Sequence, residues 1–179
     1  NINTEIDKCT FNGNVASLYG GAIFSNQGND VTIKESVFTN NKCENYYGSS
    51  IASYGHIYIS QNMFYENIGQ CDVFIASGTC DAENNYFDGS ICSIKNQGTT
   101  NCELNYWGWN SASNIETNNP TITFDSWLLS RYEIDYKEPT LGNIHQIITA
   151  KIDQYKNRLE NETSLYKQVI GNIPITVND

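Results

Sequence analysis

Phe11-Asn12-Gly13-Asn14 introduces a pattern that occurs five times, an aromatic residue three positions before a small polar residue. Successive aromatics of this pattern are 27, 26, 23 and 20 residues apart. A period in the twenties is typical of solenoids, in which neighbouring coils must stack to bury a core. The five copies are Phe11–Asn14, Phe38–Asn41, Phe64–Asn67, Phe87–Ser90 and Trp107–Asn110.

A short strand is expected before each aromatic. The residues seven and five positions earlier are mostly apolar or small, and the residue between them is mostly polar, as in Val31, Thr32 and Ile33. This alternation is typical of a half-buried β-strand. The pairs predicted to face inward are Thr4/Ile6, Val31/Ile33, Ile57/Ile59, Cys80/Ala82 and Thr100/Cys102.

A second strand is expected after each aromatic, and its copies are residues 21–24, 49–52, 72–75 and 90–93. Two or three short strands per coil, stacked at about 4.8 Å per coil, make a parallel β-helix. Parallel crossovers are overwhelmingly right-handed. The sequence therefore predicts an all-β chain whose residues 1–110 form a right-handed parallel β-helix of the solenoid type found in pectate lyases.

The repeat also predicts two columns of stacked side chains inside the coils. The aromatics should form a buried stack, made of Phe11, Phe38, Phe64, Phe87 and Trp107. Asn62, Asn85 and Asn105 each stand two residues before an aromatic. Three successive Asn residues in one column indicate a ladder of side-chain amides along the stack.

The short motifs resemble those of known surface proteins. Phe11–Asn14 and Gly20–Ile23 resemble the repeats of chlamydial polymorphic outer-membrane proteins, and still more those of adhesin-like surface proteins of methanogenic archaea. In the latter family the last coil carries Asn-x-Trp-Gly, here Asn105–Gly108, and a connector with a Trp follows, here Asp125–Leu128. The resemblance implies a cell-surface adhesin with immunoglobulin-like repeats after the β-helix.

Composition and charge narrow the range of partners. The net charge is −10, and residues 1–130 carry 13 Asp and Glu against 4 Lys and no Arg. Nucleic acids and anionic membranes need clustered basic residues, so neither is an expected partner. No apolar run is long enough to span a membrane. Because repeat-like sequence begins at once, without a signal peptide, we expect a fragment of a longer exported protein, extracellular and monomeric.

The C-terminal part follows a different pattern. Residues 111–120 look loop-like, and we expect residues 111–130 to be a connector whose Trp127 covers the open end of the coils. Residues 131–179 are predicted to be a short β segment, the truncated start of an immunoglobulin-like domain, with strands at 148–152 and 173–177. A helix is the alternative, because Ile144, Ile148 and Ile152 also fit one helical face.

Acidic residues form the first candidate binding face. Asp81, Glu83, Asn101 and Glu103 are predicted to point outward on adjacent coils. Glu83 and Glu103 would lie about 5 Å apart, which favours either a bound calcium ion shared with Asp81 or a raised carboxyl pKa. A solvated acidic surface without calcium is the simpler interpretation. No other cofactor is indicated.

Catalysis is the rival interpretation of the same acids. Enzymes on this fold usually work on the outer face of one stacked sheet. Lyases typically use a strong base, often Arg, for catalysis, and hydrolases need a pair of catalytic carboxylates at a set distance. Since residues 1–130 contain no Arg, a polysaccharide lyase or glycoside hydrolase is kept only as the alternative, and no catalytic residue is assigned.

Tyrosines form the second candidate face, because aromatics on the side of a solenoid can stack on sugars. These residues are Tyr46, Tyr47, Tyr54, Tyr58 and Tyr65. Partly buried structural roles are the alternative for most of them.

The six cysteines leave two pairings open. Cys80 and Cys102 should face inward at diagonal positions, and Cys43 and Cys71 follow their aromatics at similar places. Either pair could form a disulfide, or the thiols could stay free and buried.

Taken together, these features predict a non-catalytic adhesion module that contacts a glycan or protein on another cell. A structural stalk, with binding done elsewhere in the parent protein, is a further alternative.

Overall fold

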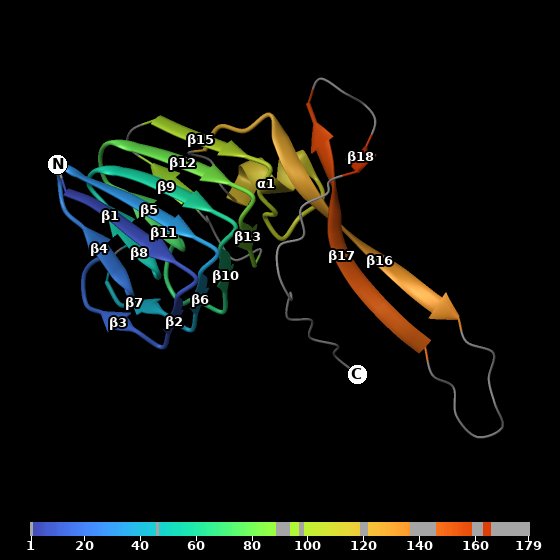
Figure 1. Cartoon of the computed structure of the whole chain (residues 1–179), viewed down its shortest axis with the longest axis horizontal. Helices are drawn as coiled ribbons and strands as arrows, with labels where there is room; N and C mark the ends of the chain where they lie inside the picture. The colour runs from blue at the N-terminus through green and yellow to red at the C-terminus, as the bar shows by residue number, and fades with distance from the viewer. Residues whose placement is uncertain are drawn as a thin grey trace.

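The predicted parallel β-helix is confirmed in the computed structural model of the chain (Figure 1). The structure describes residues 2–45, 47–88, 94–96, 99–118, 122–136, 146–158 and 163–165. One strand from each coil enters a five-stranded parallel sheet, whose members neighbour one another in chain order. These strands are β1 (Ile2–Asp7), β5 (Asn29–Lys34), β9 (His56–Ser60), β12 (Thr79–Glu83) and β15 (Thr99–Glu103).

Three further parallel sheets complete the sides of the coils. The first contains β2 (Thr10–Asn12), β6 (Val37–Thr39), β10 (Met63–Tyr65) and β13 (Tyr86–Phe87). The second contains β4 (Ile23–Ser25), β8 (Ile51–Ser53), β11 (Val73–Ile75) and β14 (Ile94–Asn96). A short pair joins β3 (Val15–Ala16) to β7 (Lys42–Cys43). The last strand of the second sheet was expected at residues 90–93, which lie outside the described residues, and the strand that pairs with β11 is β14.

The core follows the period-two pattern of the sequence. In the five-stranded sheet, Ile33 pairs with Ile6 on one side and with Ile59 on the other, so like residues stack in columns. Phe38, Phe64, Phe87 and Trp107 are at most 1% exposed. Successive rings from Phe11 to Trp107 are 4.8–4.9 Å apart and within 10° of parallel. The predicted aromatic stack is therefore present, at the spacing of the coils.

A sharp corner precedes each of Asn62, Asn85 and Asn105, and also Cys9 and Ser36, which hold the same position in the first two coils. The residues at this corner all adopt the left-handed backbone conformation, with φ between 47° and 58°, although none is glycine. They are Lys8, Glu35, Gln61, Asn84 and Leu104. Non-glycine residues rarely adopt this conformation, so five of them in one column show that the stacked neighbours determine the local backbone.

The Gly-Gly-Ala-Ile motif has a steric explanation. Gly20 has φ +59°, and a Cβ atom there would lie 2.0 Å from the carbonyl oxygen of Ile23. A Cβ atom on Gly21 would lie 2.1 Å from the carbonyl oxygen of Ser49 in the next coil. Both positions therefore need glycine, the first for a turn and the second for close approach between coils.

The C-terminal end of the coils is closed. The segment 111–120, which we expected to be a loop, contains α1 (Ala112–Asn118), whose first hydrogen bond joins Ile115 N to Ser111 O. Ser at the residue before a helix is a favoured N-cap. Ile115, Phe124 and Trp127 are at most 5% exposed and belong to the same core as Trp107.

A long hairpin follows the closed end and extends away from the coils (Figure 1). It pairs β16 (Ser126–Tyr136) antiparallel with β17 (Gln146–Asn157), and β18 (Ser164–Leu165) adds to β17. Residues 148–152 lie in β17, so the strand interpretation holds there and the helix alternative does not. The strand expected at 173–177 lies outside the described residues, and the immunoglobulin-like continuation stays a prediction.

Candidate functional site

Polar side chains cover the outer face of the five-stranded sheet, because they alternate with the core residues. The strand register arranges them in three columns that run across the coils. We call this surface the polar face. Its columns are Asn3–Asp30–His56–Thr79, Glu5–Thr32–Tyr58–Asp81–Asn101 and Asp7–Lys34–Ser60–Glu83–Glu103.

The polar face is predominantly acidic. Its only described Lys is Lys34, whose Nζ lies 3.9 Å from Glu5 Oε1 and 5.8 Å from the ring centre of Tyr58. The carboxylates of all three columns outnumber this single cation. Such a surface repels polyanions and accepts neutral or cationic ligands.

The three acids predicted to form a site are brought to one face. The register places Glu83 beside Glu103 and Asp81 beside Asn101 on adjacent coils. Each acid nevertheless has a partner of its own. The Tyr58 hydroxyl donates to Glu83 Oε1, and Asp81 Oδ2 lies 3.8 Å from His56 Nε2. Burial, followed by the bond to Glu83, raises the pKa of Tyr58 above its usual value.

Glu103 holds the connector to the last coil. Its Oε1 accepts a hydrogen bond from Asp125 N (2.9 Å), and its Oε2 accepts bonds from Ser126 N (2.7 Å) and from the Ser126 hydroxyl. Charge-assisted bonds of this kind are strong. This carboxylate is therefore committed to fixing the start of β16.

The separate partners of Asp81, Glu83 and Glu103 are relevant to the calcium site expected there, because each acid already has its own interaction. Among the residues that the structure describes, no three His, Cys, Asp or Glu side chains are grouped so that they could hold a metal ion. Asp81, Glu83 and Glu103 thus share a face without forming a preformed three-carboxylate cage. Calcium there stays a prediction.

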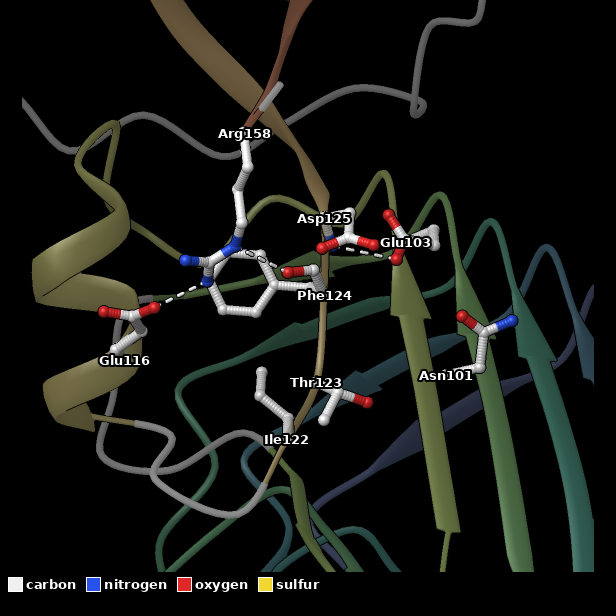
Figure 2. Close-up of a pocket in the computed structure, with 8 residues that line it drawn as sticks. All are labelled: Asn101, Glu103, Glu116, Ile122, Thr123, Phe124, Asp125 and Arg158. Carbon is white, nitrogen blue, oxygen red and sulfur yellow. Dashed lines mark hydrogen bonds and ion pairs between the residues drawn. The ribbon is translucent and has the colours of Figure 1, made fainter. Parts of the chain in front are cut away.

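An open pocket of about 560 Å³ lies where the polar face meets α1 and the connector (Figure 2). It contains two of the predicted site residues together with groups from α1 and the connector, and Arg158, which directly follows β17. The lining residues are Asn101, Glu103, Glu116, Ile122, Thr123, Phe124, Asp125 and Arg158. A second pocket, of about 360 Å³, lies at the other end of the same face and includes Glu5, Asp30 and Lys34.

Arg158 joins the elements around the first pocket. Its Nη2 lies 2.6 Å from Glu116 Oε1, and its Nε donates to the carbonyl oxygen of Phe124 at 2.9 Å. The guanidinium carbon lies 4.6 Å from the ring centre of Phe124, a cation–π distance. Arg158 could not be assigned to this pocket from the repeat, because it follows the repeat by almost 50 positions and only the fold of the hairpin returns it to the coils.

The predicted tyrosine face is wrong as a single surface. Tyr58 lies on the polar face, whereas Tyr65 lies in β10 and packs beside Met63. Tyr47 and Tyr54 lie over the sheet that contains β8, and Tyr46 is outside the described residues. The reason is geometric, because the sheets of a coil face different directions and these tyrosines are distributed over three of those sheets.

A real aromatic cluster covers the outer face of β4, β8 and β11. The rings of Tyr47 and Phe74 stack at 4.7 Å, and Tyr19 lies 6.3 Å from Phe74. Phe24 and Tyr54 complete the cluster at 5.8 Å from each other. The hydrogen bond with Tyr54 raises the pKa of Tyr19. Tyr19 and Tyr47 each precede a glycine with positive φ, a sequence signal that could have located them.

None of the cysteines that the structure describes forms a disulfide. Cys80 aligns with Thr100 and Cys102 aligns with Ala82, so the two sulfurs occupy diagonal positions and both are free thiols. Burial raises the pKa of both thiols, which makes them unreactive. Cys43 is also free, and its thiol donates to Leu18 O at 2.9 Å. Neither disulfide considered from the sequence is present in the structure.

Comparison with known protein families gives a match on the first coil. Residues 8–26 match the Chlamydia polymorphic membrane protein repeat. The matched segment contains both Phe11–Asn14 and Gly20–Ile23, the motifs on which the resemblance to chlamydial proteins rests. No curated protein and no solved structure matches the chain. The archaeal resemblance stays a prediction. In the described part of the chain, no helix is both long and apolar enough to cross a membrane.

Proposed function

We propose that the chain is a non-catalytic binding module of a cell-surface protein, and that its polar face contacts a glycan or protein on another cell. The repeat that residues 8–26 match is described for membrane proteins of Chlamydia, which fits a place on a cell surface. The contact would be extracellular, in a monomer and without a cofactor.

The observation that carries this proposal is the continuity of the polar face. Three columns of hydrogen-bonding side chains run across the five-stranded sheet, two of them over all five strands, and a pocket lies at each end. A regular row of donors and acceptors at the coil spacing suits an extended ligand with repeating units. The acidic charge favours a neutral or cationic ligand over an anionic polysaccharide.

The polar face itself supports a direct test. A triple variant, Thr32→Ala, Asp81→Asn and Asn101→Ala, removes polar groups from its middle column without touching the core. A matched control, Glu44→Gln with Asn12→Ala, makes similar changes at exposed residues away from this face. Labelled chain is applied to panels of microbial cells, host cells and purified polysaccharides. The proposal expects saturable binding that the triple variant loses and the control retains.

A polysaccharide-cleaving enzyme is the second candidate, and the first pocket is what favours it. There Glu103, Glu116 and Asp125 lie with Arg158, a carboxylate and guanidinium set that acid–base chemistry could use. The hydrogen bonds that hold Glu103 and Arg158 argue for a structural role instead. Released unsaturated or reducing sugar in the same assay would favour the enzyme. Neither binding nor product would favour a structural stalk.

A further inference from the structure

The polar face continues beyond β15 onto the connector. The backbone N of Cys102 donates to the carbonyl oxygen of Thr123 (3.2 Å), and the backbone N of Leu104 donates to that of Ser126 (3.1 Å). These bonds hold residues 122–125 alongside the last strand of the five-stranded sheet. An extended ligand that follows the columns across the coils therefore meets the connector next, at the first pocket of about 560 Å³.

Two charged side chains close the far side of this pocket. Arg158 and Glu116 form an ion pair of 2.6 Å, which joins the residue after β17 to α1. Arg158 Nε is also bound to the carbonyl oxygen of Phe124 (2.9 Å). Figure 2 shows Glu116 and Arg158 across the pocket from Asn101, which belongs to the polar face. A ligand that enters from the polar face meets this ion pair, so the pocket suits the end of a ligand rather than its middle.

The pocket combines apolar surface with hydrogen-bonding groups. Ile122 and Phe124 are among its lining residues. Within the described residues, the Asp125 carboxylate, the Asn101 side-chain amide and Arg158 Nη1 make no hydrogen bond. Apolar surface with a few placed polar groups is typical of small-molecule sites, which measure about 300–1,000 Å³. A sugar ring matches this lining, because its hydroxyls both donate and accept hydrogen bonds and its carbon atoms present apolar surface.

The charges of the pocket favour a neutral sugar. Glu103 already accepts three hydrogen bonds from the connector, and Glu116 is paired with Arg158. Asp125 is the carboxylate of this pocket whose oxygens stay available to a ligand. An acidic sugar would be repelled by these carboxylates, and a cationic sugar would lie in the same pocket as the Arg158 guanidinium.

We propose that this pocket binds the terminal sugar of a neutral glycan, so that the polar face recognises a free end of its ligand. The Asp125 carboxylate accepts hydrogen bonds from sugar hydroxyls, and Asn101 Nδ2 and Arg158 Nη1 donate to sugar oxygens. The carbon atoms of the ring pack against Ile122 and Phe124. This inference rests on the function proposed for the polar face, and it commits that function to a glycan.

The test compares the two ends of the same glycan. Neutral hexasaccharides of glucose, galactose and mannose are immobilised through the reducing end or through the non-reducing end, and binding of the full chain is measured on both surfaces. Hexasaccharides of galacturonic acid and of glucosamine are the anionic and cationic probes.

Two variants accompany the native chain. Asp125→Ala removes the free acceptor of the pocket at an exposed position. Glu44→Ala is the matched control, because it removes an exposed carboxylate from β7's end of the coil, away from the polar face. Side-chain NMR signals of Asn101 and of Arg158 Nε–H are followed as the hexasaccharide that binds is added.

The proposal expects at least one neutral hexasaccharide to bind saturably when one particular end is free, and about tenfold or more weakly when that end is tethered. Asp125→Ala should weaken the binding by about tenfold or more, because hydrogen bonds to a charged group are strong. Glu44→Ala should bind as the native chain does. The signals of Asn101 and Arg158 should shift on binding.

Equal binding with either end tethered, or native affinity of Asp125→Ala, would overturn the recognition of a free end and leave the polar face as the binding surface. Preference for a charged probe, or no binding of any hexasaccharide, would also overturn it. The function proposed for the polar face would survive the last result if cells stripped of glycans still bound the native chain and not the polar-face triple variant, because the ligand would then be a protein.

Discussion

Asn85 accepts two hydrogen bonds from Asn62 through one atom. Its Oδ1 lies 2.9 Å from the backbone nitrogen of Asn62 and 3.1 Å from Asn62 Nδ2. Asn105 accepts the same pair of bonds from Asn85, both at 2.9 Å. Every residue of this column is fully buried. The column therefore replaces a sheet at the corner of the coil, where the backbone itself cannot pair.

Asn62→Ala should destabilise the protein by about 2–4 kcal/mol, because it leaves Ser36 N–H and the Ile33 carbonyl buried without their partners. Urea unfolding measures the loss. Asn12→Ala is the control, since Asn12 is exposed, and it should cost at most about 0.5 kcal/mol. Similar losses in the two variants would contradict the structural role of the column.

Truncating a stacked phenylalanine to alanine should reduce stability by different amounts at different places in the aromatic stack. Phe64 is fully buried between Phe38 and Phe87, so Phe64→Ala should lower the free energy of unfolding by about 3–5 kcal/mol. Phe11 is half-buried and stacks on Phe38, and Phe11→Ala should cost about 1–2 kcal/mol. Equal losses in denaturant unfolding would contradict the different burial of Phe11 and Phe64.

Asp72 should make stability depend on pH. Burial raises its pKa from 3.8 to about 7, and hydrogen bonding from Ser49 opposes this only in part. The folded state then favours the neutral acid, so the contribution of Asp72 to stability is greatest below about pH 4 and is lost as the pH rises to about 7. Above that value the contribution is constant.

Asp72→Asn isolates this effect. The difference in unfolding free energy between the native chain and the variant should change by up to about 4 kcal/mol between pH 4 and pH 7, since one pKa unit corresponds to about 1.4 kcal/mol. Taking the difference cancels the other acids. A difference that is flat across this range would show that Asp72 is ionised normally.

Glu103→Gln should loosen the hairpin at its base. The amide keeps the shape of the carboxylate but loses one acceptor and the charge that binds Asp125 N and Ser126 N. We expect a loss of about 1–2 kcal/mol and faster exchange of β16 amides. Glu83→Gln on the neighbouring coil is the matched control, because its partner is Tyr58 and it does not touch the connector. Unchanged hydrogen exchange of β16 in Glu103→Gln would contradict the role of Glu103 in holding the connector.

Much of the fold was predictable, because stacking converts a linear period into columns. Once Phe11 and Phe38 align, the register of Val31, Ile33 and the ladder residues follows. The corner could not be predicted, since Lys8 and Leu104 share a left-handed backbone without sharing any side-chain chemistry. α1 was missed because a single buried Ile115 gives no helical period.

The candidate site was less predictable than the fold. The acids were assigned correctly to one face because strand alternation determines which way they point, as for Asp81 and Glu83. Their partners were not predictable, because His56 and Tyr58 come from the preceding coil and Ser126 from the connector. Tyr65 was placed on the wrong face, because it lies in β10, after the corner at Gln61, whereas Tyr58 lies in β9, before that corner.

The alignment of the Asn62–Asn85–Asn105 column with the parallel sheets has a mechanical consequence. Their hydrogen bonds run along the stacking axis, so a tensile load between the two ends is transmitted in series through each coil boundary in turn. No boundary shares the load with another, and failure begins at the weakest. Under pulling, the module should lengthen in steps of one coil, as an extensible tether rather than a rigid strut.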